Sequence, residues 1–584
     1  MYLNRESNYE KHPRTRIHGF KEEVFSGYED IIEELKKRCA KRPFVLTVDC
    51  YPGVDDGELL GALKALEADR VILTEELFKG EQTIRQQLKY QLTDDRVFGK
   101  LYAGEIRDFM DEEKLGKAEE EVKDASGLTL IYGFGAALVS PGDLLVYADL
   151  ARWEIQLRYR RGMGNYRADN GDEDILVAVV RLKKYKRGFF VEWRIADKHK
   201  AEQFESIGYL LDTNRSGRPK MISGRAFRAA LGETAVRPFR TVPYFDPGVW
   251  GGQWMKEVCG LDAQAPNFAW SFDGVPEENS LLFDFDGTVV EIPAMDLVLY
   301  QPRNLLGEAV FARFGAEFPI RFDFLDTMGG QNLSLQVHPL TEYIKKQFGM
   351  QYTQDESYYI LDAGDDAVVY LGLKDGIDRE EMIADLKRAQ EGGHPFDADR
   401  YINRFPAKKH DHFLIPAGTC HCSGKNAMVL EISATPYIFT FKLWDWGRVG
   451  LDGKPRPIHI EHGEKVIQWD RTTEWVKQNL VNAFYTVSEA DGAVEEHTGL
   501  HELEFIETRR YWFDRPIDLN TEGTVHMLNL VEGAAAVVES PEGAFEPYEV
   551  HYAETFIVPA AVGAYRVRPK NADERIGLIK AYVR

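Results

Sequence analysis

The hydrophobic pattern of this chain changes near residue 236, and this change restricts the possible folds more than any other feature. Before it, short apolar runs alternate with leucines at helical spacing, such as Leu59, Leu63 and Leu66. This alternation is typical of an α/β domain with a mostly parallel sheet. The predicted buried strands are Phe44–Asp49, Val71–Thr74, Leu128–Tyr132 and Leu144–Tyr147.

After Arg237, the pattern becomes one of short strand-like runs separated by turn residues. It continues to Arg584, with one helical pattern at Asp378–Glu391. Many short strands with turn signals between them predict an all-β region, either a sandwich or a barrel. The sequence therefore predicts a multidomain chain that joins an α/β part to an all-β part.

The all-β part contains an internal repeat. Phe413–Gly418 (FLIPAG) resembles Phe556–Ala561 (FIVPAA) in sequence and in its surroundings. Five residues after the shared proline the copies differ, since the first has His421 and the second has Ala564. We interpret them as two related barrels, of which only one carries the histidine; chance similarity of one hexapeptide is the alternative. The predicted divisions are an N-terminal arm (1–41), an α/β domain (42–235), a metal-binding barrel with a helical insertion (236–490) and a second barrel without metal ligands (491–584).

Charge and composition restrict the partners. The 584 residues include 72 Lys+Arg and 95 Asp+Glu, a net charge of −23. Nucleic acids and anionic membranes attract clustered basic residues, so neither is an expected partner. The most apolar stretch, Leu128–Ala148, is interrupted by glycines, Pro141 and Asp143, and the N-terminus has no apolar leader. Only five cysteines are present, which predicts a reduced, cytoplasmic protein. The sequence is compatible with a homo-oligomer.

Four side chains of the first barrel could bind one metal ion. Gln336 and His338 are two residues apart in a predicted strand, so they point to the same face. Glu356 precedes another apolar strand, and His421 closes a turn. Two imidazoles, a carboxylate and an amide oxygen suit Zn²⁺ and leave a position for water or substrate. Any one of these histidines taken alone has a structural role as its simpler interpretation.

These motifs resemble a known family. The spacing Pro-x-Gly-x-x-His at 416–421 is a cupin signature, and Leu-Ser-Leu-Gln-Val-His-Pro at 333–339 is similar to the signature of class I mannose-6-phosphate isomerases. Further similar segments, in the order of that family, extend the resemblance over about residues 237–584. The resemblance implies two cupin-type β-barrels and one zinc ion. It also implies interconversion of mannose 6-phosphate and fructose 6-phosphate. The zinc ligands that it implies are Gln336, His338, Glu356 and His421.

The implied reaction assigns roles to further residues. Aldose–ketose isomerisation moves a proton between C1 and C2 through a cis-enediol(ate), which requires an acid/base group and positive charge near the oxygens. Glu431 matches a family carboxylate beside the metal and is the candidate for proton transfer. Lys442 and Arg448 are the candidates for charge stabilisation. The candidates for substrate binding are Ser334, Arg321 and Arg456, and Lys454 adds positive charge nearby in sequence.

Two departures from the family affect the substrate. Lys442 stands where the family usually has arginine, and Asp323 where it usually has a lysine thought to bind phosphate. A carboxylate at that place repels phosphate. One alternative is therefore an isomerase of a neutral or a different phosphorylated sugar. Another is a non-catalytic, metal-bearing sugar sensor or scaffold.

Residues 42–235 are similar to nucleoside- and uridine-kinase domains of the P-loop type in the order of their segments. The phosphate-binding pattern G-x-x-x-x-G-K-[ST] is missing, because the loop Asp49–Gly57 has two acids and no lysine. We therefore predict a degenerate kinase-like domain that does not hydrolyse ATP and has a structural, oligomeric or regulatory role.

Overall fold

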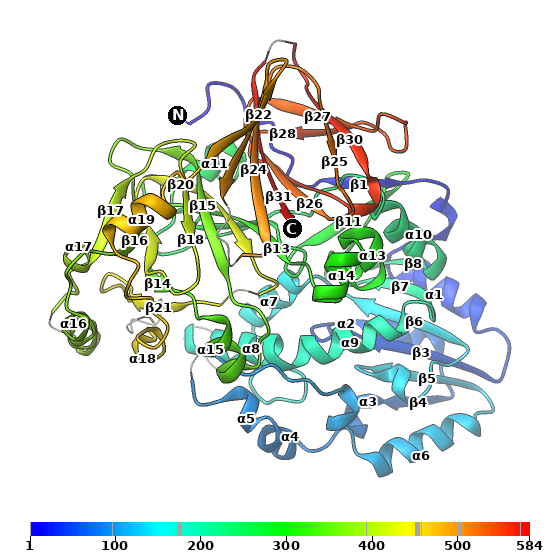
Figure 1. The fold of residues 1–584 in the computed structure, drawn as a ribbon. Coiled ribbons are helices and arrows are strands. Elements are labelled where there is room, and N and C mark those ends of the chain that lie inside the picture. Colours follow the sequence, from blue (N-terminus) through cyan, green and yellow to red (C-terminus); the bar gives the residue numbers. More distant parts are fainter. Residues whose placement is uncertain are drawn as a thin grey trace. The chain divides into compact units, whose positions relative to one another are not determined.

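The computed structural model describes all residues except 1, 96, 172–177, 393, 438, 450–455, 457, 500–503 and 573, and the side chains of 178–182. The chain is a mixed α/β protein with several β-sheets, and it divides into two compact units (Figure 1). The α/β unit comprises residues 14–234 and 280–300, and the β-rich unit comprises 1–13, 235–279 and 301–584. The predicted arm of residues 1–41 is thus divided between the units.

The α/β unit is built on a seven-stranded sheet of order β2-β8-β7-β6-β3-β5-β4. The five strands from β7 to β4 are parallel, whereas β8 at one edge runs antiparallel to β7, and β2 runs antiparallel to β8. Helices on a parallel sheet bury both of its faces, which explains the continuous apolar runs in β3, β5 and β6. The strands are β2 (Val24–Ser26), β3 (Phe44–Cys50), β4 (Arg70–Leu73), β5 (Leu128–Gly133), β6 (Leu144–Asp149), β7 (Ile207–Asp212) and β8 (Lys220–Ser223).

Helices connect these strands. The longer ones are α1 (Gly27–Arg38), α2 (Asp56–Leu63), α4 (Glu81–Gln87), α6 (Glu112–Lys123), α7 (Arg152–Arg160), α8 (Ala178–Arg187), α9 (Trp193–Gln203) and α10 (Gly224–Thr234). A small second sheet completes the unit, in which β1 (Arg14–Ile17) pairs with β11 (Ser280–Phe285), and β11 with β12 (Thr288–Pro293). The α12 helix (Met295–Tyr300) follows and brings Asp296 to the buried Lys200, 2.8 Å away. Residues 280–300 therefore belong to the α/β unit, although they lie within the predicted first barrel.

The β-rich unit contains two pairs of sheets. The first sheet pair has the orders β18-β15-β20-β13-β10-β9 and β17-β16-β19-β14-β21, and the second has β22-β23-β24-β31-β26-β29 and β25-β30-β27-β28. The first pair comprises β9 (Tyr244–Asp246), β10 (Trp270–Gly274), β13 (Ile320–Asp326), β14 (Leu335–Val337), β15 (Asp355–Ala363), β16 (Val368–Leu373), β17 (Ile402–Pro406), β18 (His412–Ile415), β19 (His421–Ser423), β20 (Ala427–Ala434) and β21 (Phe441–Trp444).

The second pair comprises β22 (Tyr485–Ala490), β23 (Ala493–Gly499), β24 (Ile506–Phe513), β25 (Ile517–Asn520), β26 (His526–Glu532), β27 (Ala535–Glu539), β28 (Tyr548–His551), β29 (Thr555–Val558), β30 (Ala564–Pro569) and β31 (Ile576–Val583). Its two sheets bury a common apolar core that includes Phe513, Leu528, Val538, Phe556 and Leu578. The helical insertion predicted between the strands of the first pair is α16 (Arg379–Glu391). The other helices of five or more residues are α11 (Trp254–Val258), α13 (Pro302–Leu306), α14 (Glu308–Phe314), α15 (Thr341–Phe348) and α19 (Thr473–Asn479).

The two sheet pairs repeat one topology, as the sequence repeat predicts. The order β18-β15-β20-β13 matches β29-β26-β31-β24, and β17-β16-β19-β14 matches β28-β27-β30-β25, strand for strand along the chain. The repeated hexapeptides begin in β18 and β29, the equivalent edge strands. The internal repeat is therefore a repeat of fold and not a chance similarity of six residues.

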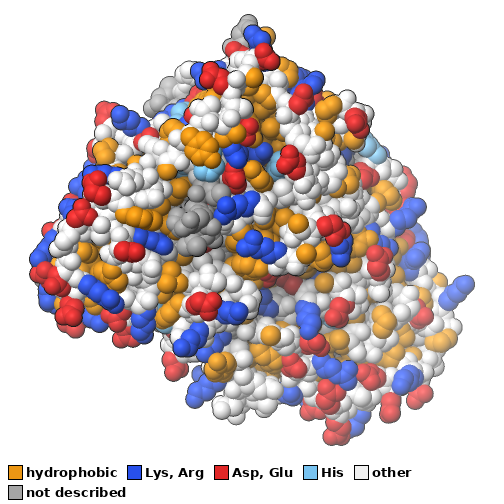
Figure 2. Space-filling model, viewed as in Figure 1, with side chains coloured by type: hydrophobic (Ala, Val, Ile, Leu, Met, Phe, Trp, Pro, Cys, Tyr) orange, Lys and Arg blue, Asp and Glu red, His pale blue; other side chains and the backbone are white. Residues whose placement is uncertain are grey.

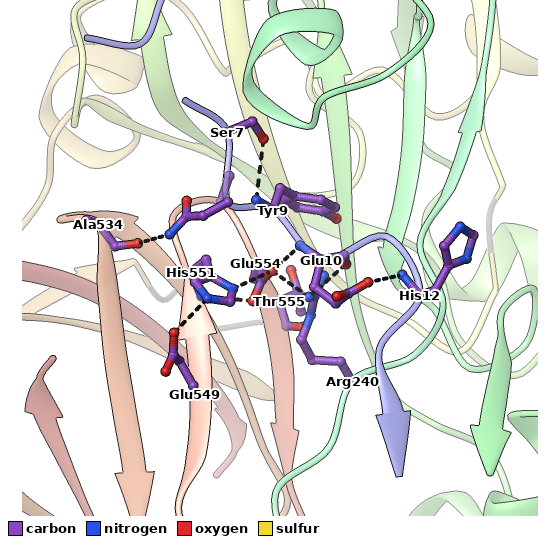
Figure 3. A network of polar contacts seen from close by, with 12 residues as sticks. Ser7, Tyr9, Glu10, His12, Arg240, Ala534, Glu549, His551, Glu554 and Thr555 are labelled. Atoms are coloured by element: carbon purple, nitrogen blue, oxygen red, sulfur yellow. Dashed lines mark hydrogen bonds and ion pairs between the residues drawn. The ribbon is translucent and has the colours of Figure 1, made fainter. Parts of the chain in front are cut away.

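Residues 7–12 are held on the β-rich unit by a network of polar contacts (Figure 3). Arg240 donates to the carbonyl of Glu10 at 3.0 Å, and it pairs with Glu554 at 2.7 Å, where both side chains are 1% exposed. The hydroxyl of Tyr9 donates to Asp273 at 2.6 Å, and His551 lies 3.0 Å from Glu554.

Surface charge is mixed. On the face drawn in Figure 2, Lys and Arg side chains are interspersed with Asp and Glu. No helix among the described residues is long and apolar enough to cross a membrane.

Candidate metal centre

The four predicted metal ligands come together between the two sheets of the first sheet pair. Gln336 on β14 is paired directly with His421 on β19 and with Lys442 on β21, so these side chains project from one face in a row. Glu356 comes from β15 in the opposing sheet, and His338 directly follows β14. All four are buried, because they point between the sheets.

The ligand atoms lie close together. His338 Nε2 is 3.1 Å from Glu356 Oε2, and His421 Nε2 is 2.9 Å from Glu356 Oε1. The amide nitrogen of Gln336 is 3.2 Å from His421 Nε2, and a half-turn of the amide brings its oxygen to this place. One ligand atom from each of His338, Glu356 and His421 lies within 4.8 Å of the others.

Backbone carbonyls fix the tautomer of both histidines. His338 Nδ1 is 2.8 Å from the carbonyl oxygen of Phe439, and His421 Nδ1 is 2.8 Å from that of Thr419. A carbonyl only accepts, so both Nδ1 atoms carry hydrogen and each neutral ring presents its Nε2 lone pair to Glu356. Among the described residues His338 Nε2 and Glu356 Oε1 have no hydrogen-bond partner.

Converging lone pairs require a cation. A proton on His338 is the alternative to a metal cation. Burial disfavours the charged imidazolium, but the negative charge of Glu356 has the larger effect, so the pKa of His338 is raised. A neutral imidazole whose Nδ1–H is held by a carbonyl is the usual zinc ligand. Two such rings, one carboxylate and one amide therefore fit a divalent metal ion of the zinc type.

Two further carboxylates lie on the inner face beside Glu356. Burial and the charges of Glu356 and Asp323 raise the pKa of Glu431 well above its usual range. Asp323 lies directly opposite Glu431 on β13, and its pKa is raised to about 7, chiefly by burial and against the effect of Arg321. Glu431 Oε1 accepts from Gln354 at 3.1 Å and from Ser433 at 3.0 Å. A carboxyl with a raised pKa can both hold and release a proton at neutral pH.

The predicted basic residues are divided between two environments. Lys442 is in the row with Gln336 and His421, and burial, with the positive charges of Arg456 and Arg448, lowers its pKa to about 8. Arg448 and Arg456 instead converge on Asp445, at 2.5 and 2.9 Å, where Ser334 also donates at 2.8 Å. This second group joins β14 to β21. Lys454 lies outside the described residues.

Arg321 is buried on β13, 3.9 Å from both Glu277 and Asp323. Its Nε and Nη2 atoms have no hydrogen-bond partner among the described residues. A buried guanidinium with unused donors is suited to a polar ligand.

Two residues of the site were not foreseen. Gln354 links the acids, since its Nε2 lies 2.8 Å from Glu356 and 3.1 Å from Glu431, and its Oε1 accepts from the Phe439 N–H. It precedes Glu356 by two residues, so the period of an extended chain indicates the same face. Asp445 had a weaker signal, because it follows β21 in a turn.

In the α/β unit, part of the loop Asp49–Gly57 lines an acidic cavity of about 850 Å³. Asp55 caps α2 by accepting from the Glu58 N–H, which occupies the helix N-terminus where a phosphate could bind. Each lining arginine is already paired: Arg158 and Arg161 with Glu154, and Arg167 with Glu75. No lysine is among the lining residues that the structure describes.

Comparison with known proteins gives two kinds of match. Residues 27–236 match a family model described as "Domain of unknown function (DUF8485)". Over 234 residues, which are 40% of this chain and 69% of the relative, the chain is 27% identical to mannose-6-phosphate isomerase ManA of Bacillus subtilis (strain 168). The probable mannose-6-phosphate isomerase GmuF of the same organism is 28% identical over the same lengths.

Solved structures of the same kind are also similar. The mannose 6-phosphate isomerase from Bacillus subtilis gives a TM-score of 0.48 at 17% identity, over 59% of this chain and 100% of that one. A zinc-bound mannose 6-phosphate isomerase gives 0.46 at 14% identity, over 60% and 100%. About 234 residues of this chain are thus homologous to mannose-6-phosphate isomerases, and this homology supports an isomerase.

Proposed function

We propose that the protein is a zinc-dependent aldose–ketose isomerase that interconverts mannose 6-phosphate and fructose 6-phosphate. One observation carries the proposal: two Nε2 lone pairs fixed by backbone carbonyls converge on Glu356, next to a carboxyl with a raised pKa. The homology to mannose-6-phosphate isomerases supplies the substrate. Zinc, bound by Gln336, His338, Glu356 and His421, supplies a Lewis acid for the sugar oxygens.

Glu431 is the proposed acid/base. Proton transfer between C1 and C2 through a cis-enediol(ate) needs one group that accepts a proton at one carbon and returns it to the other. Burial and two neighbouring carboxylates keep the pKa of Glu431 high enough for this exchange. Gln354 and Ser433 hold its Oε1, so the other oxygen is the one that faces the reacting carbons in this proposal.

Lys442 is the proposed electrostatic partner of the enediolate. Its strand pairing with Gln336 supports this role, and a partly buried ammonium stabilises negative charge more strongly than one in water. Arg321 is proposed for substrate binding through its unused donors. Ser334, Arg448 and Arg456 act in this proposal by positioning β21 through Asp445.

A coupled assay of mannose 6-phosphate conversion tests the proposal, together with metal analysis by mass spectrometry. His421→Ala is expected to lose zinc and at least about a thousandfold in kcat, since a metal ligand and the Lewis acid are removed together. His394→Ala, at an exposed histidine of the same unit, is the matched control. Equal activity of His421→Ala and the wild type would refute the proposed site.

A second candidate is isomerisation of a neutral or a different phosphorylated sugar. The buried Asp323 motivates it, because a carboxylate on the inner face disfavours a phosphate dianion. A panel of aldoses and aldose phosphates compares the two. Turnover of mannose 6-phosphate alone would exclude the second candidate.

For the α/β unit we propose a degenerate kinase-like domain without ATP hydrolysis. The capped α2 helix and the paired arginines of its cavity support this. Substantial magnesium-dependent ATP turnover by the purified full chain would contradict it.

A further inference from the structure

The second sheet pair contains counterparts of five positions in the first site. Strand registers define the counterparts once Phe413 is aligned with Phe556: Glu356 opposes Ile415 just as His526 opposes Val558. The pairings between the other strands then extend this alignment, residue by residue, to the other strands of both sheets. The correspondences are Gln336 with Asn520, Asp323 with Arg509, Glu356 with His526, His421 with Ala564 and Glu431 with Lys580.

The charge of the central pair is inverted between the two sites. In the first, Asp323 lies directly opposite Glu431; in the second, Arg509 lies directly opposite Lys580. Like charges in directly opposite positions destabilise a sheet. The pair of carboxylates in the first site lies beside a cluster of side chains that fits a cation. By the same reasoning, the pair of positive charges in the second site indicates an anion.

Lys580 is a buried cation with neither a hydrogen-bond nor an ion-pair partner among the described residues. It is 8% exposed, and no acceptor among the described residues lies within hydrogen-bond distance of its Nζ. Two aromatic rings lie beside it, with Nζ 5.2 Å from the Tyr511 ring centre and 4.8 Å from that of Tyr582. Burial lowers the pKa of Lys580 to about 8, which reflects the missing counter-charge.

Arg509 is only partly satisfied. Its Nη2 pairs with Glu507, whereas its Nε and Nη1 are buried without a hydrogen-bond partner in the described part of the chain. The charges of two further carboxylates, Glu495 and Glu522, also act on Lys580, but neither is paired with it; Glu495 accepts from the hydroxyl of Tyr511 at 3.0 Å. Buried donors without acceptors are costly to fold, so several in one place indicate that a ligand supplies the acceptors.

We propose that the inner face of the second sheet pair binds a phosphate-type oxyanion between Lys580 and Arg509. The tetrahedral oxygens of such an anion can accept from the ammonium and from the free guanidinium donors together. His526 lies next to this position and holds its Nδ1 2.8 Å from the Tyr565 hydroxyl. Inorganic phosphate and the phosphate group of a sugar share this chemistry.

Isothermal titration of the full chain with inorganic phosphate, at constant ionic strength, tests the proposal. Lys580→Met should weaken phosphate binding at this site about tenfold or more, because it removes a charged donor and keeps the length of the side chain. Lys477→Met, at an exposed lysine of the same unit, should leave binding unchanged. Lys442→Met separates the two sites, since it acts only on phosphate bound beside the metal ligands.

Phosphate binding that survives Lys580→Met and is lost in Lys442→Met would overturn the proposal, and so would no binding at millimolar phosphate. A thermal melt adds a second measurement. In phosphate-free buffer, removal of one of two facing positive charges should not lower Tm; a marked loss would mean that Lys580 has an internal partner. Titration with hexose 6-phosphate identifies the source of the anion. If the anion is the phosphate group of a sugar, the chain should bind two molecules, one of which is lost in Lys580→Met and the other in Lys442→Met. This part of the test rests on the proposed function.

Discussion

Asp323 on β13 and Glu431 on β20 lie directly opposite each other, and the pKa of both carboxyl groups is raised, first of all by burial. Directly paired residues of antiparallel strands have their Cβ atoms about 5 Å apart. Two carboxylates at that separation in a buried site do not both ionise readily, so the pair retains a proton near neutral pH. The shared proton links Glu431, the proposed acid/base, to Asp323, which stands where mannose-6-phosphate isomerases usually have lysine.

Replacement of Asp323 should therefore change substrate binding. Asp323→Asn removes the carboxylate at this position, so the negative charge of the pair stays on Glu431, and it keeps the shape of the side chain. We expect KM for mannose 6-phosphate to fall about threefold to tenfold, or ~1 kcal/mol, because repulsion of the phosphate is relieved. Steady-state kinetics measure it, and the exposed Asp124→Asn in the α/β unit is the control. An unchanged KM would show that Asp323 lies away from the phosphate.

Gln354 should act as a positioning residue. Gln354→Ala removes the donor that both Glu356 and Glu431 accept from, so each carboxylate is free to turn. We expect kcat to fall about tenfold to a hundredfold, with a smaller change in KM. Zinc content is measured in parallel. Loss of activity with full zinc content would assign the effect to Glu431, whereas loss of zinc would assign it to Glu356.

The network in Figure 3 should contribute to stability. Arg240→Met leaves the buried Glu554 and Asp273 without their cation, and breaking a buried ion pair costs about 3–5 kcal/mol. Calorimetry of the full chain should show a lower transition temperature, and hydrogen exchange should show lost protection over residues 5–12. Addition of Glu554→Gln should restore part of the loss, because it removes one uncompensated charge. A double variant no more stable than the single one would contradict this explanation.

Glu532 predicts a pH dependence of stability. Hydrogen bonds from His410 and Lys409 lower its pKa from 4.5 to about 2. A carboxylate whose folded pKa is lowered stabilises the fold above its unfolded pKa, and this contribution is lost as pH falls from about 4.5 to about 2. Because the side chain is 39% exposed, we expect only about 1 kcal/mol. Thermal melts of the wild type and Glu532→Gln should differ at pH 6 and converge at pH 2. A constant difference would argue against the pairing.

Much of the fold could be predicted from the sequence, because its signals are local. Two hexapeptides indicated a repeat that the strand orders confirm, and the periodicity of residues 378–391 indicated α16. The hairpin of β11 and β12 gave no such signal, since strands that join another unit have the same alternation as strands of the barrel. The acidic pair of the first site and the basic pair of the second could not be predicted from the sequence either. The two residues of each pair are distant in sequence, and only the strand register brings them opposite each other.

The two units are not consecutive along the chain, which passes from one to the other four times, after residues 13, 234, 279 and 300. A fragment that ends at residue 234 lacks β11, β12 and Asp296, and it leaves the buried Lys200 with one carboxylate instead of two. A fragment that begins at residue 235 lacks the N-terminal segment of the β-rich unit, in which Arg240 donates to the backbone carbonyl of Glu10. A gene cut at the apparent domain boundary would therefore yield two incomplete proteins, so the full-length chain is the smallest piece that contains all of either unit.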